Sequence, residues 1–334
     1  MKSRLPSVAD FATGIRAGNS MLLARAITLI ESQHSKHRAM AQELLAELLP
    51  ETGGAQRIGV TGVPGVGKST FLDGFGMHLI EQGHKVAVLA VDPSSSLTGG
   101  SILGDKARMN RLAQSPQAFI RPSPSGTTLG GVARRTRESL LLCEAAGFSI
   151  VLVETVGVGQ SETVVADMVD FFLVLMLPGA GDELQGIKKG ILELADVIAV
   201  NKADGDNLGR ARAAQSDYSA ALHYLQPKSE SWQPRALSIS GLTGTGLDEL
   251  WQVIQAHHKA MTTSGHGAAV RRTQRSNWMW SQIKERLLET FQQHPRIAAA
   301  LPQIEEAIAS GSLPPSVAAD QLLDLFTQQE LHGS

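Results

Sequence analysis

The chain has 334 residues, with 30 lysines and arginines against 32 aspartates and glutamates, and aromatic residues make up 4% of it. The near-zero net charge argues against nucleic acid or an anionic membrane as the main partner, and the scarcity of aromatic rings argues against base stacking. The single cysteine, Cys143, excludes an intramolecular disulfide and any metal site built from several cysteines. The longest apolar run, residues 171–177, is too short to span a bilayer, and no apolar run follows Met1, so we expect a cytoplasmic protein.

Residues 1–54 are predicted to form a helical extension. Ser7 and Asp10 have the spacing of a capping box at the start of a first helix, and Asn19 or Ser20 is suited to cap a second. Apolar residues recur on one face of each helical stretch here, which favours a helical layer packed against the rest of the chain.

A glycine-rich stretch follows the first predicted strand, residues 57–61, and precedes a predicted helix, residues 71–82. It has the form Gly-x-x-x-x-Gly-Lys-Ser/Thr, and its flanks are those of a phosphate-binding loop, which a chance glycine-rich turn would lack. Lys68 would reach the β- and γ-phosphates, and the Ser69 hydroxyl would ligate Mg²⁺. The chain is therefore predicted to bind a nucleoside triphosphate. The residues of this loop are Gly62, Val63, Pro64, Gly65, Val66, Gly67, Lys68, Ser69 and Thr70.

Between residues 55 and 261, short apolar strands alternate with helical stretches. This pattern predicts an α/β domain of the P-loop NTPase class, with a mostly parallel sheet covered by helices on both faces. In such sheets, ligands bind at the carboxyl ends of the strands. The polar residues that end predicted strands, and that should therefore meet at this edge, are Asp92, Glu154, Asn201 and Ser238.

Two acidic stretches are candidates for binding the metal and the γ-phosphate. Glu154 begins a Glu-x-x-Gly form of the usual Asp-x-x-Gly, so its carboxylate would hold the metal through water while the Gly157 N–H contacts the γ-phosphate. Asp92 and Asp105 flank a loop rich in serine and glycine, residues 93–104, which we expect to respond to the γ-phosphate and Mg²⁺. An ordinary turn or helix cap is the alternative for both aspartates. The predicted metal ligands are Ser69, Asp92, Asp105 and Glu154.

Val158 occupies the position after Gly157, where a glutamine would orient the hydrolytic water. We therefore expect unassisted turnover well below about one per second, unless another group or a partner helps. Residues 178–186 form an acidic, glycine-rich loop beside this region. It is either a long connection between a strand and a helix or, in the interpretation we favour, a nucleotide-dependent switch. Lys188, just beyond it, could reach into the site.

Residues 201–204 have the form Asn-Lys-x-Asp at the end of a strand. The Asp204 carboxylate can accept hydrogen bonds from N1–H and the 2-amino group of guanine, which adenine does not offer, so this residue would select GTP over ATP. Asn201 can tie the loop to the phosphate loop, and the Lys202 stem can cover the base. The loop expected to close over the base is Ser238, Ile239, Ser240 and Gly241.

Residues 262–334 are predicted to form a C-terminal helical extension. A linker of small residues, 262–268, should lead to three helices that make a subunit interface. His257 and His258 are expected on an exposed helix, and no histidines recur at ligand spacing, so the cluster that a metal-delivery protein needs is missing.

These motifs resemble the MeaB/ArgK-type GTPases, the methylmalonyl-CoA mutase-associated chaperones, which are related to the nickel-insertion GTPases of urease and hydrogenase. The resemblance rests on residues 62–70, the Asp92 and Glu154 stretches, residues 178–186 and residues 201–204, and covers about residues 5–330. It implies a homodimer that hydrolyses GTP with Mg²⁺, gates adenosylcobalamin loading onto methylmalonyl-CoA mutase and protects that enzyme. It also implies phosphate, metal or catalytic roles for Lys68, Ser69, Asp92, Asp105, Glu154 and Lys188.

Two other functions are open. The first is a kinase or ATPase linked to arginine and ornithine transport, although an ATP user has no need of the guanine-selective Asp204, and competition of GTP against ATP would separate the two. The second is a metallochaperone GTPase, which the lack of cysteine and histidine clusters disfavours and metal analysis would test.

Overall fold

The fold is described from a computed structural model. The structure describes residues 5–32, 34–91, 108–122, 129–155, 161–179, 189–225 and 227–327. The chain divides into two compact units, Met1–Gln274 and Arg275–Ser334. The division into segments 1–54, 55–261 and 262–334 stays a prediction.

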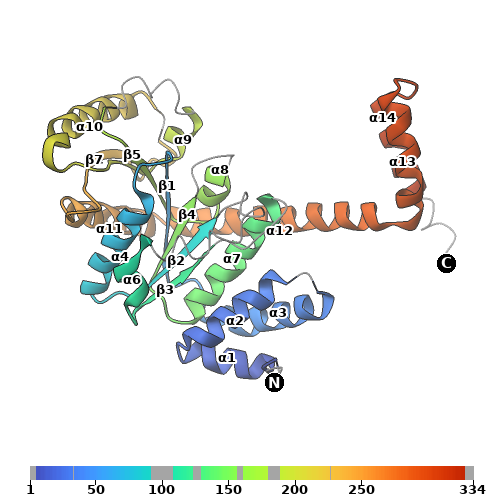
Figure 1. Ribbon diagram of the computed structural model, residues 1–334, viewed down its shortest axis with the longest axis horizontal. Coiled ribbons are helices and arrows are strands. Elements are labelled where there is room, and N and C mark those ends of the chain that lie inside the picture. Colours follow the sequence, from blue (N-terminus) through green and yellow to red (C-terminus); the bar gives the residue numbers. More distant parts are fainter. Residues whose placement is uncertain are drawn as a thin grey trace. The chain divides into compact units, whose positions relative to one another are not determined.

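A seven-stranded, fully parallel sheet forms the centre of the first unit within the described residues (Figure 1). Its strand order is β3-β2-β4-β1-β5-β6-β7. The strands are β1 (Gln56–Gly62), β2 (Val86–Val91), β3 (Ala118–Arg121), β4 (Ile150–Thr155), β5 (Phe171–Met176), β6 (Val197–Val200) and β7 (Arg235–Ser238). The prediction of a parallel α/β sheet is confirmed.

Helices connect and flank these strands. In the described residues they are α1 (Val8–Arg16), α2 (Ser20–Glu31), α3 (Ser35–Leu48), α4 (Lys68–Glu81), α6 (Asn110–Gln114), α7 (Leu129–Ala145), α8 (Ser161–Ala166), α9 (Lys189–Leu194), α10 (Leu208–His223), α11 (Leu247–Thr263), α12 (His266–Gln293), α13 (Pro295–Ala309) and α14 (Pro315–Thr327), with short 3-10 turns η1 (Leu49–Glu51) and η4 (Gly205–Asn207). The helix after the glycine-rich loop begins at Lys68 rather than at residue 71, because Phe71 N–H already donates to the Gly67 carbonyl at 2.9 Å.

Both faces of the sheet are buried because successive side chains of a strand point to opposite sides. In β2, Val86 and Val88 belong to the apolar core under α4, α6 and α11, whereas Ala87, Leu89 and Val91 belong to the core under α7, α8, α9 and α10. Strands that are apolar throughout are typical of this arrangement.

The N-terminal helices α1, α2 and α3 pack on the outside of α7. The predicted caps are confirmed: Ser7 and Asp10 form a reciprocal capping box, and the Asn19 side chain accepts the Met21 and Leu22 N–H groups. An amphipathic helical layer thus thickens one face of the first unit.

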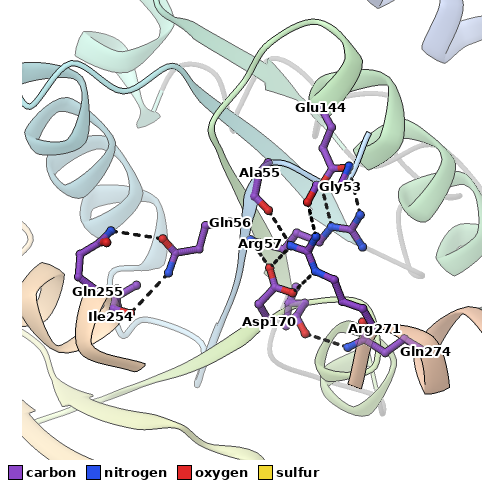
Figure 2. Close-up of polar contacts among 11 residues, drawn as sticks. Gly53, Ala55, Gln56, Arg57, Glu144, Asp170, Ile254, Gln255, Arg271 and Gln274 are labelled. Atoms are coloured by element: carbon purple, nitrogen blue, oxygen red, sulfur yellow. Dashed lines mark hydrogen bonds and ion pairs between the residues drawn. The ribbon is translucent and has the colours of Figure 1, made fainter. Parts of the chain in front are cut away.

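A polar cluster fixes the first turns of α12 at the amino edge of the sheet (Figure 2). Arg271 pairs with both carboxylate oxygens of Asp170, at 2.6 and 2.7 Å, and its guanidinium also donates to the Gly53 and Ala55 carbonyls. Asp170 in turn accepts the Arg57 N–H at 2.9 Å. The cluster therefore joins α12 to the starts of β1 and β5.

Two predictions near α12 are wrong. The expected linker, residues 262–268, is mostly helical: α11 runs to Thr263 and α12 begins at His266. Only Ser264 and Gly265 separate them, because Gly265 takes φ 72° and the other small residues are compatible with a helix. His257 is not on an exposed face either, since it is 3% exposed and packs edge-on against the Phe171 and Trp232 rings, each 5.0 Å away.

In the second unit, α13 packs on α14. The Phe326 ring lies 5.3 Å from Phe291 and 5.4 Å from His294. Large apolar side chains remain exposed in this unit, and they are Met279, Trp280, Leu287, Leu288, Val317 and Leu323.

Candidate nucleotide-binding site

The phosphate-loop sequence forms a tight turn between β1 and α4. Gly67 has φ 92°, in the left-handed region that a side chain disfavours. A Cβ on Gly62 would lie 2.6 Å from the Leu175 carbonyl oxygen of the neighbouring strand. The N-terminus of α4 follows directly, with its positive end of the helix dipole at Lys68. This geometry is a cradle for an anion.

Lys68 lies inside this cradle. Its ammonium donates to the Gly62 carbonyl at 2.7 Å and approaches the Val63 carbonyl at 3.4 Å. Burial lowers the pKa of Lys68, and the charges of Glu154 and Glu162 offset part of this effect. Sequence reasoning had not selected Glu162, because it matches no motif and only the fold brings it near the phosphate loop.

Asn201 links the two loops of the site. Its side-chain amide donates to the Val66 carbonyl at 2.8 Å, and its oxygen accepts the Gly241 N–H at 3.0 Å. The neighbouring Lys202, at φ 60°, extends its ammonium to the Gly65 carbonyl at 2.8 Å. Three segments distant in sequence are therefore held together at the carboxyl ends of β1, β6 and β7.

The Asp204 carboxylate is oriented by Ser240. The buried Ser240 hydroxyl donates to Asp204 and accepts the Thr243 N–H at 3.1 Å. Ser238 does not face the same way, because its hydroxyl donates to Gln215 of α10 at 2.7 Å. Ile239 is fully buried and donates its N–H to the Val200 carbonyl. Within this loop, Asp204 and Ser240 thus present the polar groups, while Ser238 and Ile239 fix the backbone.

Two glycines let this loop touch α4. A Cβ on Gly241 would lie 2.6 Å from the Phe71 Cα, and a Cβ on Gly74 would lie 2.4 Å from the Gly241 carbonyl oxygen. The loop around Ser240 therefore rests directly on the helix that follows the phosphate loop, backbone against backbone.

The predicted metal ligands are described only in part. Ser69 lies in the first turn of α4, and Glu154 lies near the end of β4, in register with Val60 of β1 and Ala90 of β2. Beside them, the Thr61 and Thr155 hydroxyls are 2.6 Å apart. Asp92, Asp105, Gly157 and Lys188, with Val158 and residues 180–187, lie outside the described residues. Among the described residues, no group of three or more histidine, cysteine or acidic side chains is placed to hold a metal ion.

The comparison with known families decides the identification. A protein-family model described as Methylmalonyl Co-A mutase-associated GTPase MeaB matches residues 23–296. The chain belongs to the MeaB family. It is therefore a P-loop GTPase, and membership of the family implies binding of guanine nucleotides.

Known proteins resemble this MeaB-family chain along almost its whole length. A relative from Caulobacter vibrioides is 58% identical over 310 residues, which cover 93% of this chain and 95% of the relative. The mouse methylmalonic aciduria type A homolog, a mitochondrial protein, is 48% identical, with 94% of this chain and 78% of the relative covered. The crystal structure of a LAO/AO transport system kinase is 42% identical with a TM-score of 0.77, covering 97% of this chain and 99% of that one.

In the described part of this MeaB-family chain, no helix is both long enough and apolar enough to cross a bilayer.

Proposed function

We propose that this GTPase is a Mg²⁺-dependent chaperone of methylmalonyl-CoA mutase, which gates the loading of adenosylcobalamin onto that enzyme and protects it. The observation that carries the proposal is the family match over residues 23–296, whose description names the mutase. The 48% identity to the mouse methylmalonic aciduria type A homolog supports it. We place the protein in the cytoplasm, where a lone buried thiol such as Cys143 stays reduced.

At the base end, we propose that Asp204 reads guanine, with Asn201, Lys202 and residues 238–241 holding the loop around it. The Ser240 hydroxyl donates a hydrogen bond to the Asp204 carboxylate and thereby restricts its orientation. Asp204→Asn tests this directly, because an amide cannot accept both hydrogen bonds from guanine. We expect competition binding to show preference for GTP over ATP reduced by about 10-fold or more. Unchanged preference would contradict the assignment.

At the phosphate end, we propose that the backbone of residues 62–70 and the Gly157 N–H bind the phosphates, with Lys68 as the cation. The described donors fit a Mg²⁺ ion, because a hydroxyl at Ser69 and a carboxylate at Glu154 are both hard oxygen ligands. Asp92 and Asp105 would complete the set, and Lys188 would act on the transferred phosphate. When bound, Mg²⁺ neutralises charge that develops on the β- and γ-phosphate oxygens.

Homodimerisation through the second unit belongs to this proposal. Its exposed Met279, Trp280, Leu287 and Leu288 are large apolar side chains that a partner surface would cover. Pull-down with the chain bound to a non-hydrolysable GTP analogue should recover the mutase from a host that makes it, and size-exclusion chromatography with light scattering should give twice the chain mass. Failure to recover the mutase from such a host would contradict the chaperone role.

The alternative function, a kinase linked to transport, rests on the name of the 42% identical structure, a LAO/AO transport system kinase. Asp204 counts against the kinase, because an ATP user has no need of a carboxylate that can accept hydrogen bonds from N1–H and the 2-amino group of guanine. Transfer of labelled γ-phosphate from ATP to an acceptor protein would support the kinase, whereas release of free phosphate from GTP alone supports the chaperone.

A further inference from the structure

Two buried threonine hydroxyls meet at the ends of β1 and β4, which are neighbouring strands of the sheet (Figure 1). In this hydroxyl pair, the Thr61 and Thr155 oxygens are 2.6 Å apart, and the two residues are 1% and 0% exposed. The backbone pairing of the strands runs as far as Val60 with Glu154, one residue earlier on each strand. One hydroxyl donates to the other, which offsets the cost of burying both. A side-chain hydrogen bond thus extends the link between the strands by one residue.

The hydroxyl pair and the Glu154 side chain lie on opposite faces of the sheet, because side chains alternate along a strand. Thr155 shares its face with Val153, which belongs to the apolar core under α7 and α8. Glu154 shares its face with Leu152, which belongs to the core under α4, the helix that begins at Lys68. The effect of the Glu154 charge on Lys68 agrees with this placement. Any influence of the hydroxyl pair on Glu154 therefore passes through the backbone.

The residues next to the hydroxyl pair belong to the predicted site. Thr61 directly precedes Gly62, the first residue of the phosphate loop, and Thr155 directly follows Glu154. Two hydroxyl oxygens that share a hydrogen bond approach to 2.6 Å here, whereas two methyl groups in contact stay about 3.5–4.0 Å apart. Replacing the hydroxyls by methyl groups would therefore move the two strand ends apart by about 1 Å.

We propose that Thr61 and Thr155 are positioning residues, whose hydrogen bond sets the spacing between the phosphate loop and Glu154 that Mg²⁺ binding requires. Mg²⁺ demands near-ideal octahedral geometry, with ligand distances of about 2.0–2.1 Å, so a shift of about 1 Å between its ligands weakens binding. Groups that hold metal ligands in place typically contribute about 10- to 100-fold in metal affinity. This inference rests on the metal site proposed above, in which Ser69 and Glu154 hold the ion.

The test uses two double variants that separate the hydrogen bond from the packing. Thr61→Val with Thr155→Val keeps the shape of both side chains and removes both hydroxyls, so its unfolding midpoint should stay close to the wild-type value. Thr61→Ser with Thr155→Ser is the matched control. It keeps both hydroxyls and removes two buried methyl groups, so its unfolding midpoint should fall.

The measurement is the single-turnover rate of GTP hydrolysis over a series of Mg²⁺ concentrations. In the valine double variant, we expect the Mg²⁺ concentration that gives half the maximal rate to rise about 10-fold or more. In the serine double variant it should change by less than about twofold, although this variant is the less stable of the two. A hydroxyl pair that only stabilises the sheet predicts the reverse order, with the Mg²⁺ dependence following the unfolding midpoint.

Two results would overturn the proposal: a wild-type Mg²⁺ dependence in the valine double variant, or an equal shift in both double variants. If the valine double variant does not fold, the single changes Thr155→Val and Thr155→Ser give the same comparison, because only the serine can keep the hydrogen bond to Thr61. Hydrolysis by the wild-type chain that does not depend on Mg²⁺ would instead refute the metal site itself. The two failures are therefore distinguishable.

Discussion

Replacing Asn201 by alanine should separate the two loops of the nucleotide site. The change removes the amide that donates to the Val66 carbonyl and accepts the Gly241 N–H. Val66, Asn201 and Gly241 are all buried, so water cannot replace the lost partners without a rearrangement.

The expected magnitude follows from the two groups left behind. An unsatisfied buried donor or acceptor costs about 1–3 kcal/mol, so the two groups together should lower the free energy of unfolding by about 2–6 kcal/mol. For a domain of this size the midpoint of thermal unfolding should fall by roughly 4–24 °C. If about half of this free energy must be supplied again when nucleotide binding orders the loops, the Kd for GTP should rise about 5- to 150-fold.

The assay is urea unfolding of the nucleotide-free chain, followed by titration with a fluorescent guanine nucleotide. Asn110→Ala, at an exposed asparagine of α6, is the matched control and should leave both measurements unchanged. If the free energy of unfolding of Asn201→Ala is within about 0.5 kcal/mol of the wild-type value, the two Asn201 hydrogen bonds do not stabilise the fold measurably, which contradicts the prediction.

Three further changes test other parts of the fold. Gly241→Ala places a Cβ 2.6 Å from the Phe71 Cα, and this overpacking should lower the free energy of unfolding by about 1–3 kcal/mol in urea. Arg271→Ala leaves the half-buried Asp170 carboxylate without its bidentate partner and should cost about 2–4 kcal/mol, with faster amide exchange in the first turns of α12. Burial lowers the pKa of His257 below 6.5 in the folded chain, so the unfolded chain takes up the proton first. Stability present above about pH 6.5 should therefore fall as the pH drops below this value, and His257→Phe should reduce that slope in a pH series of unfolding measurements.

Much of the nucleotide-binding edge could be predicted because its signals are local. The spacing of glycines in residues 62–70 fixes a turn between a strand and a helix, and wholly apolar runs identify the strands. Since parallel strands end at one edge, the tether from Asn201 to the phosphate loop could be expected before any coordinates.

The remainder depends on packing between distant segments. His257 looks like part of an exposed polar pair, but the turn of α11 places it between Phe171 and Trp232. Asp170 and Arg271 are 101 positions apart, and nothing local distinguishes them from solvated surface charges. Glu162 belongs to the phosphate region only because α8 packs on β1.

The contact of Gly241 with Phe71 and Gly74 has a consequence for anyone who wishes to re-engineer base preference. A loop transplanted from another nucleotide-binding protein in place of residues 238–241 would have to fit the backbone of the first two turns of α4 closely. No layer of side chains lies between this loop and the helix at Gly241 to absorb a misfit. Chimeras should therefore exchange the loop and that helix as one cassette, and libraries that randomise the loop while keeping α4 should yield few folded clones.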